Sequence, residues 1–225
     1  MMHFLHEHSL LILLSSATLL ATVWLYIEKE RLGINLMGAI LFAIFSTCFG
    51  VCAVSLFAKI ESIGDPTAVG RMSVYGGMAF MPVFCLIVNK ITKKSLADIY
   101  DIFTVILIST ISFARINCII TGCCKGNPIA DTGMRWPTRE AELIYYIVFL
   151  ITIVPSVYKN NSNGLVFPKY MVSYGIFRVI CEFFREDLSI VGPVHIAHVW
   201  SILAIIIGLS VLIEMQGVRR EGRVS

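Results

Sequence analysis

The chain contains uncharged apolar runs that are long enough to cross a membrane. Ser9–Ile27 has 19 residues without a charge, and Ile34–Ala58 is a second uncharged run. An apolar helix of about 20 residues crosses the roughly 30 Å hydrocarbon core of a bilayer. The composition agrees, because 57% of the 225 residues are hydrophobic and only 15% are charged. This leaves too little polar surface to cover a water-soluble domain, which excludes an ordinary soluble enzyme.

The apolar runs together predict an all-α integral membrane protein. We expect one transmembrane domain over residues 1–225, built as a bundle of seven transmembrane helices. No Lys or Arg precedes the first run, so we interpret that run as a span and not as a cleavable signal peptide. The predicted spans cover approximately residues 9–27, 34–58, 73–89, 99–122, 142–158, 165–184 and 196–213.

The distribution of basic residues predicts the orientation of the bundle. With the N-terminus outside, ten Lys and Arg residues lie in inside segments, counting Lys169 at the inner end of its span. Six lie in outside segments, and Arg115 and Arg178 lie deeper within spans. Loops on the cytoplasmic side carry an excess of Lys and Arg, so we expect the N-terminus out and the C-terminus in. The small net charge of +3 is spread over short clusters, which excludes a basic face for nucleic acid.

Two predicted spans contain an arginine. Arg115 interrupts the span 99–122, where a buried arginine costs at least a few kcal/mol. Such a residue faces a partner or a functional cavity, or it extends to the membrane interface. Arg178, Glu182 and Arg185 are spaced i, i+4 and i+7, which places them on one face of a helix. This face is either a structural ion pair or a cationic site for an anionic head group, because arginine binds phosphate with two donors.

The predicted topology brings the unusual polar residues of four spans to one depth. Tyr75 with Gly76-Gly77, Arg115, Glu142 and the Arg178 group all fall near the outer leaflet. Isolated arginines that extend to the interface would occur at both faces. The convergence therefore predicts a site at this level, although packing between small residues would also explain the two glycines.

Adjacent cysteines follow the fourth predicted span. Cys123 and Cys124 are either structural residues at a helix end or reactive thiols beside Lys125 and Arg115. A zinc site would need four Cys or His ligands at suitable spacing. His195 and His198 are the only partners considered, and nothing fixes their distance from Cys123, so we expect no metal and no cofactor. The cysteines inside apolar runs are interpreted as packing residues; these are Cys48, Cys52, Cys85 and Cys181.

These segments resemble the prolipoprotein diacylglyceryl transferase family over about two-thirds of the chain, from Gly70 to the last span. Tyr174–Arg185 resembles the family's Tyr-Gly-x-x-Arg-x-x-x-Glu-Phe-x-Arg closely, and this is the most specific match. Ala114–Gly126 resembles the signature Gly-Arg-x-Gly-Asn-Phe-x-Asn-Gly-Glu-x-x-Gly. Arg71–Gly77 resembles Met-Ser-Phe-His-Gly-Gly with one preceding residue, and Pro137–Glu142 resembles Pro-Ser-Gln-Leu-Tyr-Glu.

The chain departs from the family pattern at several positions, and four of these departures bear on the chemistry. Tyr75 stands where the family has its usual catalytic histidine. Cys118 and Thr121 stand at the first and second Asn of the signature, and Cys123 stands at its Glu. The chain thus resembles a divergent, short member with a Gly-Cys-Cys-x-Gly signature. The acceptor and the group that takes the proton do not carry over from the resemblance.

The resemblance implies a transferase of the bacterial inner membrane, a multi-pass protein. It would move a diacylglyceryl group from phosphatidylglycerol to the thiol of a prolipoprotein lipobox cysteine, or of a related acceptor, and release glycerol phosphate. The implied partners are these substrates and membrane lipid, and no nucleic acid. The implied catalytic residues are Arg178, Arg115, Tyr75 and Glu182, with Arg185, Gly76, Gly77, Asn117, Thr121, Glu142 and Tyr174 in substrate binding.

Other functions compete with this interpretation. A non-catalytic phospholipid-binding or transport protein would use the same cationic face, but transport needs a continuous polar path, and the inner halves of the spans are apolar. A membrane thiol-redox protein would use Cys123 and Cys124, which lack the Cys-x-x-Cys spacing. Tyr75 in the transferase would orient or relay, because a phenol with a pKa near 10 is a poor base at neutral pH.

Overall fold

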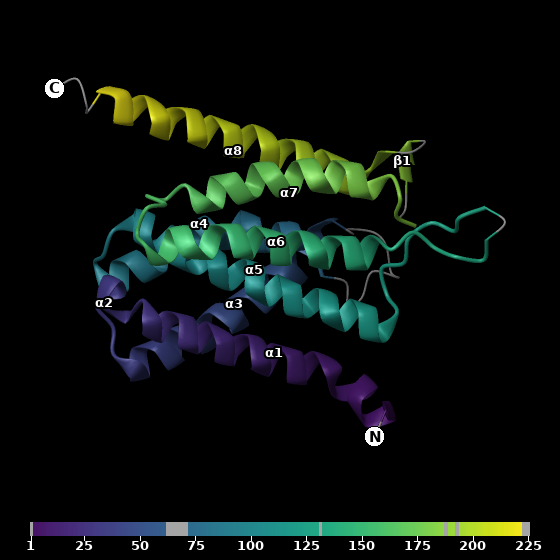
Figure 1. Cartoon of the computed structure of the whole chain (residues 1–225), viewed down its shortest axis with the longest axis horizontal. Helices are drawn as coiled ribbons and strands as arrows, with labels where there is room; N and C mark the ends of the chain where they lie inside the picture. The colour runs from purple at the N-terminus through teal and green to yellow at the C-terminus, as the bar shows by residue number, and fades with distance from the viewer. Residues whose placement is uncertain (1, 62–71, 131, 187–188, 192–193, 222–225) are drawn as a thin grey trace. The chain divides into compact units, whose positions relative to one another are not determined.

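The computed structural model describes residues 2–61, 72–130, 132–186, 189–191 and 194–221 (Figure 1). Arg71, the first residue of the segment that resembles Met-Ser-Phe-His-Gly-Gly, lies outside them. Within these ranges the chain forms eight helices and one two-stranded hairpin. The elements are α1 (Met2–Ile27), α2 (Lys29–Leu32), α3 (Leu36–Glu61), α4 (Val74–Thr92), α5 (Leu96–Thr121), α6 (Thr138–Tyr158), α7 (Val166–Glu182), β1 (Ser189–Val191), β2 (Val194–His195) and α8 (Ile196–Glu221).

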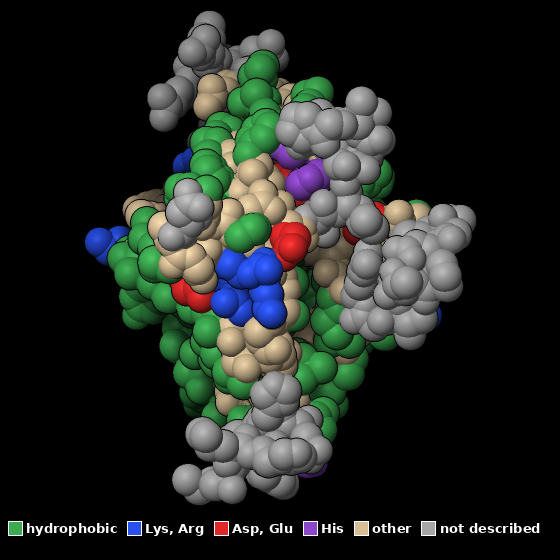
Figure 2. Space-filling view, turned by 90° about the vertical axis from the view of Figure 1, so that its right-hand side faces the viewer, with side chains coloured by type: hydrophobic (Ala, Val, Ile, Leu, Met, Phe, Trp, Pro, Cys, Tyr) green, Lys and Arg blue, Asp and Glu red, His purple; other side chains and the backbone are tan. Residues whose placement is uncertain are grey.

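The predicted class of helical membrane protein is confirmed. Among the described residues, six helices are long and apolar enough to cross a membrane, namely α1, α3, α4, α5, α6 and α8. Large hydrophobic side chains lie exposed along them, and examples are Leu19, Ile144, Ile151 and Ile213. Figure 2 shows hydrophobic side chains at the surface of one end of the molecule. Such a surface is stable against lipid and not against water. α7 is not among the six, since it has 17 residues and contains Lys169, Arg178 and Glu182.

The chain divides into two compact units. The first comprises Met1–Cys123 and Arg139–Gly164, and the second comprises Cys124–Thr138 and Leu165–Ser225. In the first unit, α5 packs against α1 and α4, and α3 packs against α1 and α4. Alanines that are almost fully buried on α1 and α3, such as Ala21 and Ala43, let these helices approach closely. Hydrogen bonds add to the packing, because Thr18 and Thr47 Oγ1 atoms lie 3.0 Å apart.

The beginning of α4 packs directly on the backbone of α3. The Ser73 backbone N–H donates to the Val54 carbonyl oxygen at 3.1 Å, one residue before the helix begins. A Cβ atom at Gly76 would lie 2.5 Å from the Ala53 carbonyl oxygen, a distance that no side chain tolerates. Glycine at this position therefore allows the close approach that fixes the buried Tyr75 on the preceding residue.

In the second unit, α7 and α8 form an antiparallel pair joined by the β1–β2 hairpin (Figure 1). Small residues lie at their contact. A Cβ atom at Gly175 would lie 2.9 Å from the Ser201 carbonyl oxygen, and one at Gly208 would lie 3.0 Å from the Pro168 carbonyl oxygen. The pairing of small residues lets the two backbones approach, as is typical of helices in membranes.

The loop before α6 is ordered by the chain that follows α7. The Asn127 backbone N–H donates to the Phe184 carbonyl oxygen at 2.8 Å, and Gly126 forms an antiparallel bridge with Arg185. The rings of Trp136 and Phe184 lie 4.6 Å apart between centroids. This pairing fixes the backbone at Arg185.

A polar junction connects three segments of the first unit at Arg31. Its Nη1 donates to Glu28 Oε2 at 3.0 Å and to the Val157 carbonyl oxygen at 2.9 Å, and its Nη2 bonds to Asp98 and Asn160. Burial raises the pKa of the Glu28 carboxyl, an effect that the positive charge of Arg31 offsets in part. Burial also lowers the pKa of Arg31, but the hydrogen bond to Asp98 and the charge of Glu28 outweigh it and raise the pKa overall.

We expect Arg31→Gln to destabilise the protein by about 2 kcal/mol, because it leaves the buried Glu28 carboxylate without its cation. Thermal unfolding of the purified protein in detergent would measure the change. Lys90→Gln is the matched control, since Lys90 is an exposed cation at the end of α4, and we expect it to unfold like the wild type. Equal unfolding of the Arg31 and Lys90 variants would contradict a structural role for this junction.

Candidate functional site

The carboxylate of Glu182 lies at the centre of a buried cluster in the second unit. Arg178 Nη2 lies 2.8 Å from Glu182 Oε2, one turn earlier on α7. Glu182 has no exposed surface and Arg178 is 6% exposed. A carboxylate buried to this degree is stable only when it is paired, so the ion pair fixes the position of both side chains.

Arg185 completes the pairing from beyond the helix. The i, i+4, i+7 spacing predicted that Arg185 lies on the same helical face as Arg178 and Glu182. α7 ends at Glu182, so Arg185 lies beyond the helix. A turn brings it back instead, with the Arg185 backbone N–H donating to the Glu182 carbonyl oxygen at 3.1 Å. Arg185 Nε then lies 3.8 Å from Glu182 Oε2. Two guanidinium groups and one carboxylate give this cluster a formal charge of +1, which favours an anion.

Sequence reasoning missed the role of His195, which it considered only as a metal ligand. His195 Nδ1 lies 3.2 Å from Glu182 Oε1, so the imidazole holds the carboxylate oxygen that Arg178 does not. The His195 backbone N–H donates to His198 Nδ1 at 3.0 Å, and both rings are buried. The only signal in the sequence was a pair of histidines at the start of an apolar run.

Tyr174 supports the same face of α7. It lies one turn before Arg178, it has no exposed surface, and its ring stacks on Tyr170 with 5.6 Å between centroids. The spacing of one turn places Tyr174 on the same side of α7 as Arg178.

A second buried ion pair lies in the first unit. Arg115 Nη2 on α5 lies 2.8 Å from Glu142 Oε1 on α6, and Tyr146 donates its hydroxyl to the same oxygen at 3.0 Å. Arg115 is 8% exposed and Glu142 has no exposed surface. Arg115 is therefore a paired, buried residue and not one that extends alone to the interface. The contact also joins two separate segments of the sequence that each resemble the family, Ala114–Gly126 and Pro137–Glu142.

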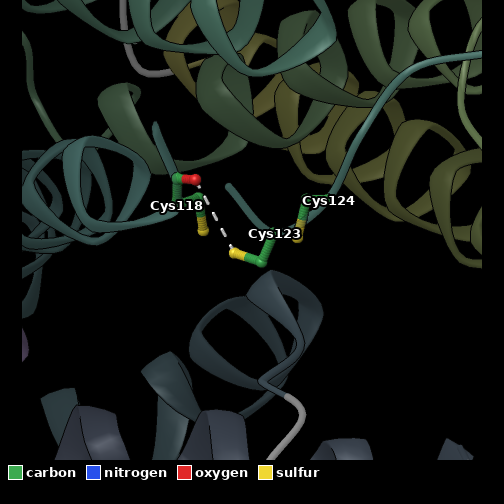
Figure 3. Close-up of side chains that lie close together, drawn as sticks. All are labelled: Cys118, Cys123 and Cys124. Carbon is green, nitrogen blue, oxygen red and sulfur yellow. Dashed lines mark hydrogen bonds between the residues drawn. The ribbon is translucent and has the colours of Figure 1, made fainter. Parts of the chain in front are cut away.

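The end of α5 carries the remaining polar residues. Asn117 Oδ1 accepts a hydrogen bond from Ser9 at 2.7 Å, and the Thr121 hydroxyl donates to the Asn117 carbonyl oxygen at 2.9 Å and to Cys123 Sγ at 3.4 Å. After the helix, the chain turns so that Cys118, Cys123 and Cys124 gather at one place (Figure 3).

The structure thus groups the predicted site residues within each unit. Arg178, Glu182 and Arg185 meet in the second unit, next to Tyr174. In the first unit Arg115 meets Glu142, and Asn117 meets Thr121. Tyr75, Gly76 and Gly77 lie together at the buried start of α4. The union of these groups in a single site stays a prediction.

Comparison with known proteins decides the family. A family model described as prolipoprotein diacylglyceryl transferase matches residues 5–214. The chain belongs to the prolipoprotein diacylglyceryl transferase family. This confirms the resemblance drawn from the Tyr174–Arg185 and Ala114–Gly126 segments.

Family relatives are similar at low identity. The phosphatidylglycerol–prolipoprotein diacylglyceryl transferase of Finegoldia magna is 26% identical over 158 residues, 64% of this chain and 62% of its own length. The protein of the same name from Clostridium tetani is 26% identical over 157 residues, 62% of this chain and 60% of its own length. The one from Helicobacter pylori is 24% identical over 177 residues, 70% of this chain and 62% of its own length. The matched part of the chain therefore spans less than two-thirds of each relative.

Loss of the Glu142 charge should strongly destabilise this family member. Glu142→Gln leaves the Arg115 guanidinium buried without a counter-charge, so we expect a loss of about 3 kcal/mol in the free energy of unfolding. Denaturant titration of the protein in mixed micelles would measure it. Glu140→Gln removes a carboxylate that is 41% exposed on the same helix, and we expect it to cost less than about 1 kcal/mol. Similar losses for the two variants would show that the buried Arg115–Glu142 pair contributes no more to the free energy of unfolding than an exposed carboxylate does.

Proposed function

We propose that the chain is a membrane transferase that moves a diacylglyceryl group from phosphatidylglycerol to a cysteine thiol. The acceptor is the lipobox cysteine of a prolipoprotein or a related thiol, and glycerol phosphate is released. Membership of the family and the printed names of the relatives support this activity. The observation that carries it is the buried pair of Arg178 with Glu182, which provides a fixed guanidinium for a phosphate.

The arginines would stabilise the leaving phosphate. Charge develops on the phosphate oxygens as the bond to the glyceryl carbon breaks, and a preorganised guanidinium stabilises it. Arg178 is the principal candidate, oriented by Glu182, and Arg185 adds a second positive charge to the same cluster. Arg115 is a second candidate ligand, held by Glu142. The glycines at 76 and 77, with Asn117, Thr121 and Tyr174, would line the substrate site.

The family's histidine cannot deprotonate the acceptor thiol here, because this chain lacks it. Tyr75 occupies that position, and we assign it an orienting role because its phenol is a poor base at neutral pH. A cysteine thiol has an ordinary pKa of about 8.5, so a moderate activation suffices to form the thiolate.

We also propose that residues 1–225 form one transmembrane domain of seven spans in the bacterial inner membrane. α7 would be the seventh span, and its low hydropathy follows from the site residues that it carries. The excess of basic residues in the predicted inside segments supports an outer N-terminus and an inner C-terminus.

Transfer should be tested directly with the purified protein in detergent. Phosphatidylglycerol labelled in its acyl chains is incubated with a lipobox peptide, and label on the peptide is measured. A peptide with Ser in place of Cys is the control and should stay unlabelled. Lipid binding without transfer to any thiol peptide would favour a phospholipid-binding protein and overturn the transferase proposal.

Arg178→Lys separates a phosphate ligand from a simple ion pair. Lysine keeps the charge that pairs with Glu182, so the protein should fold and insert normally. It lacks the planar, bidentate guanidinium, so turnover should fall about 100-fold, with a smaller effect on lipid affinity. Lys169→Gln, an exposed cation on the same helix, should transfer at the wild-type rate. Near wild-type turnover of Arg178→Lys would make Arg115 the leading phosphate ligand.

Reporter fusions should test the orientation. A fusion after Ser225 should report a cytoplasmic position, and a fusion truncated after Gly133, in the loop before α6, should report an external position. The opposite pair of results would reverse the topology, and two cytoplasmic results would reject the seven-span arrangement.

A further inference from the structure

Three cysteine thiols gather at the end of α5. Cys118, Cys123 and Cys124 lie within seven consecutive residues, and their Sγ atoms all lie within 4.8 Å of one another (Figure 3). Cys123 is exposed, and the other two are half-buried. Neither the phosphate-binding residues nor Tyr75 accounts for this cluster, although Cys118 and Cys123 stand at polar positions of the family signature.

The backbone is folded so that the thiols converge. Gly122 and Cys124 both adopt left-handed conformations, with φ of 71° and 53°. A non-glycine residue seldom adopts this conformation unless its surroundings require it. Arg139 Nη1 donates to the carbonyl oxygens of Cys118 at 3.4 Å and Cys123 at 3.5 Å, which holds the turn against the helix end. The side chain of Arg139 also brings a positive charge beside the thiols.

The dimensions suit a thiophilic metal ion. A Zn–S bond is about 2.3 Å, so two thiolates in a tetrahedral site lie about 3.8 Å apart. Thiols within 4.8 Å of one another reach this arrangement by side-chain rotations that move sulfur by about 1 Å. We propose that Cys118, Cys123 and Cys124 bind one Zn²⁺ ion whose fourth position receives the thiol of the acceptor; the second part of this proposal rests on the proposed transferase function.

A disulfide explains the cluster less well. Consecutive Cα atoms are 3.80 Å apart, which is shorter than the usual Cα separation across a disulfide, so a Cys123–Cys124 bond would be strained. A bond from Cys118 to either residue would leave the third thiol unused. Sequence reasoning predicted no metal because it required a fourth protein ligand, for which His195 and His198 were the candidates. Three protein ligands with one open position are the arrangement of catalytic zinc sites, where substrate or water binds last.

The metal would supply the activation that Tyr75 cannot. An acceptor thiol that binds Zn²⁺ loses its proton to water and becomes a thiolate. Its sulfur then forms a bond to the glyceryl carbon of phosphatidylglycerol, while the bond from that carbon to the phosphate oxygen breaks. Glycerol phosphate leaves with the electron pair, and the metal does not change its oxidation state. One helical turn of α5 separates Cys118 from Arg115, so the metal and a phosphate ligand would lie on the same face.

Metal binding can be measured without any transfer. The intact protein is purified in detergent under reducing conditions, loaded with Zn²⁺, desalted and analysed for metal. We expect about one Zn²⁺ per chain for the wild type and a loss of binding in Cys118→Ser, Cys123→Ser and Cys124→Ser. Cys123→His keeps a zinc ligand and should retain metal, which separates loss of a ligand from misfolding. Cys48→Ser and Cys52→Ser, exposed positions on α3, are the matched controls and should bind like the wild type.

Either of two results would overturn the metal site. The first is that the wild type retains no zinc, or that the three Ser variants retain as much as the wild type. The second is a disulfide between two of the three cysteines, found by mass spectrometry of protein purified without a reductant. This result overturns the site if reduction of that protein does not restore zinc binding.

The open position is tested with Co²⁺ in place of Zn²⁺. Thiolate-to-cobalt absorption should increase when a lipobox peptide with Cys is added, and not with the Ser peptide. An unchanged spectrum would overturn the role in acceptor binding. With phosphatidylglycerol present, removal of zinc by a chelator should slow transfer about 100-fold, and added zinc should restore it. Full transfer by the metal-free protein would reject the role of the metal and leave the transferase proposal standing. Binding of the peptide to the metal without any transfer would reject the transferase proposal and leave the metal site standing.

Discussion

The charged groups of this protein are governed by the cost of burying an ion where water cannot reach it. Glu182 has no exposed surface, and it lies within 4 Å of Arg178, Arg185 and His195. Because removal of any one partner leaves a buried carboxylate partly uncompensated, the three contacts position one another. The turn after α7 places Arg185 beside this carboxylate, where a bridge to Gly126 holds its backbone, and the residue before α8 places His195 there.

The same constraint organises the first unit in a different way. Arg115 is the buried cation there, and its partner Glu142 comes from a helix that begins after the long loop. The hydroxyl of Tyr146 binds the same carboxylate oxygen, so a single group fixes α5 and one face of α6. In both units a glutamate with no exposed surface holds an arginine in one orientation, and a guanidinium fixed in this way needs little reorganisation to bind a further anion.

The sequence predicted what depends on composition and helical period. Uncharged runs of about 20 residues predicted a helical membrane protein, and the spacing of Arg178 and Glu182 predicted their contact, because i and i+4 meet in any α-helix. It did not predict the position of Arg185, since a helix end and a turn decide it, nor the contact of His195 with Glu182, which joins two elements through a hairpin. The number of spans also stays a prediction, because α7 has only 17 residues and carries the charged residues Lys169, Arg178 and Glu182.

The departures from the family pattern have a common chemical direction. Where the family has a histidine, this chain has Tyr75, which is a weaker base; where the signature has Asn and Glu, the chain has Cys118 and Cys123. One change removes a proton acceptor, and the others add sulfur ligands next to Cys124, within 4.8 Å of one another. The arginine–glutamate pairs that would hold the phosphate are retained. The loss of a histidine and the gain of two cysteines beside Cys124 are the changes expected if the proposed metal had replaced a base.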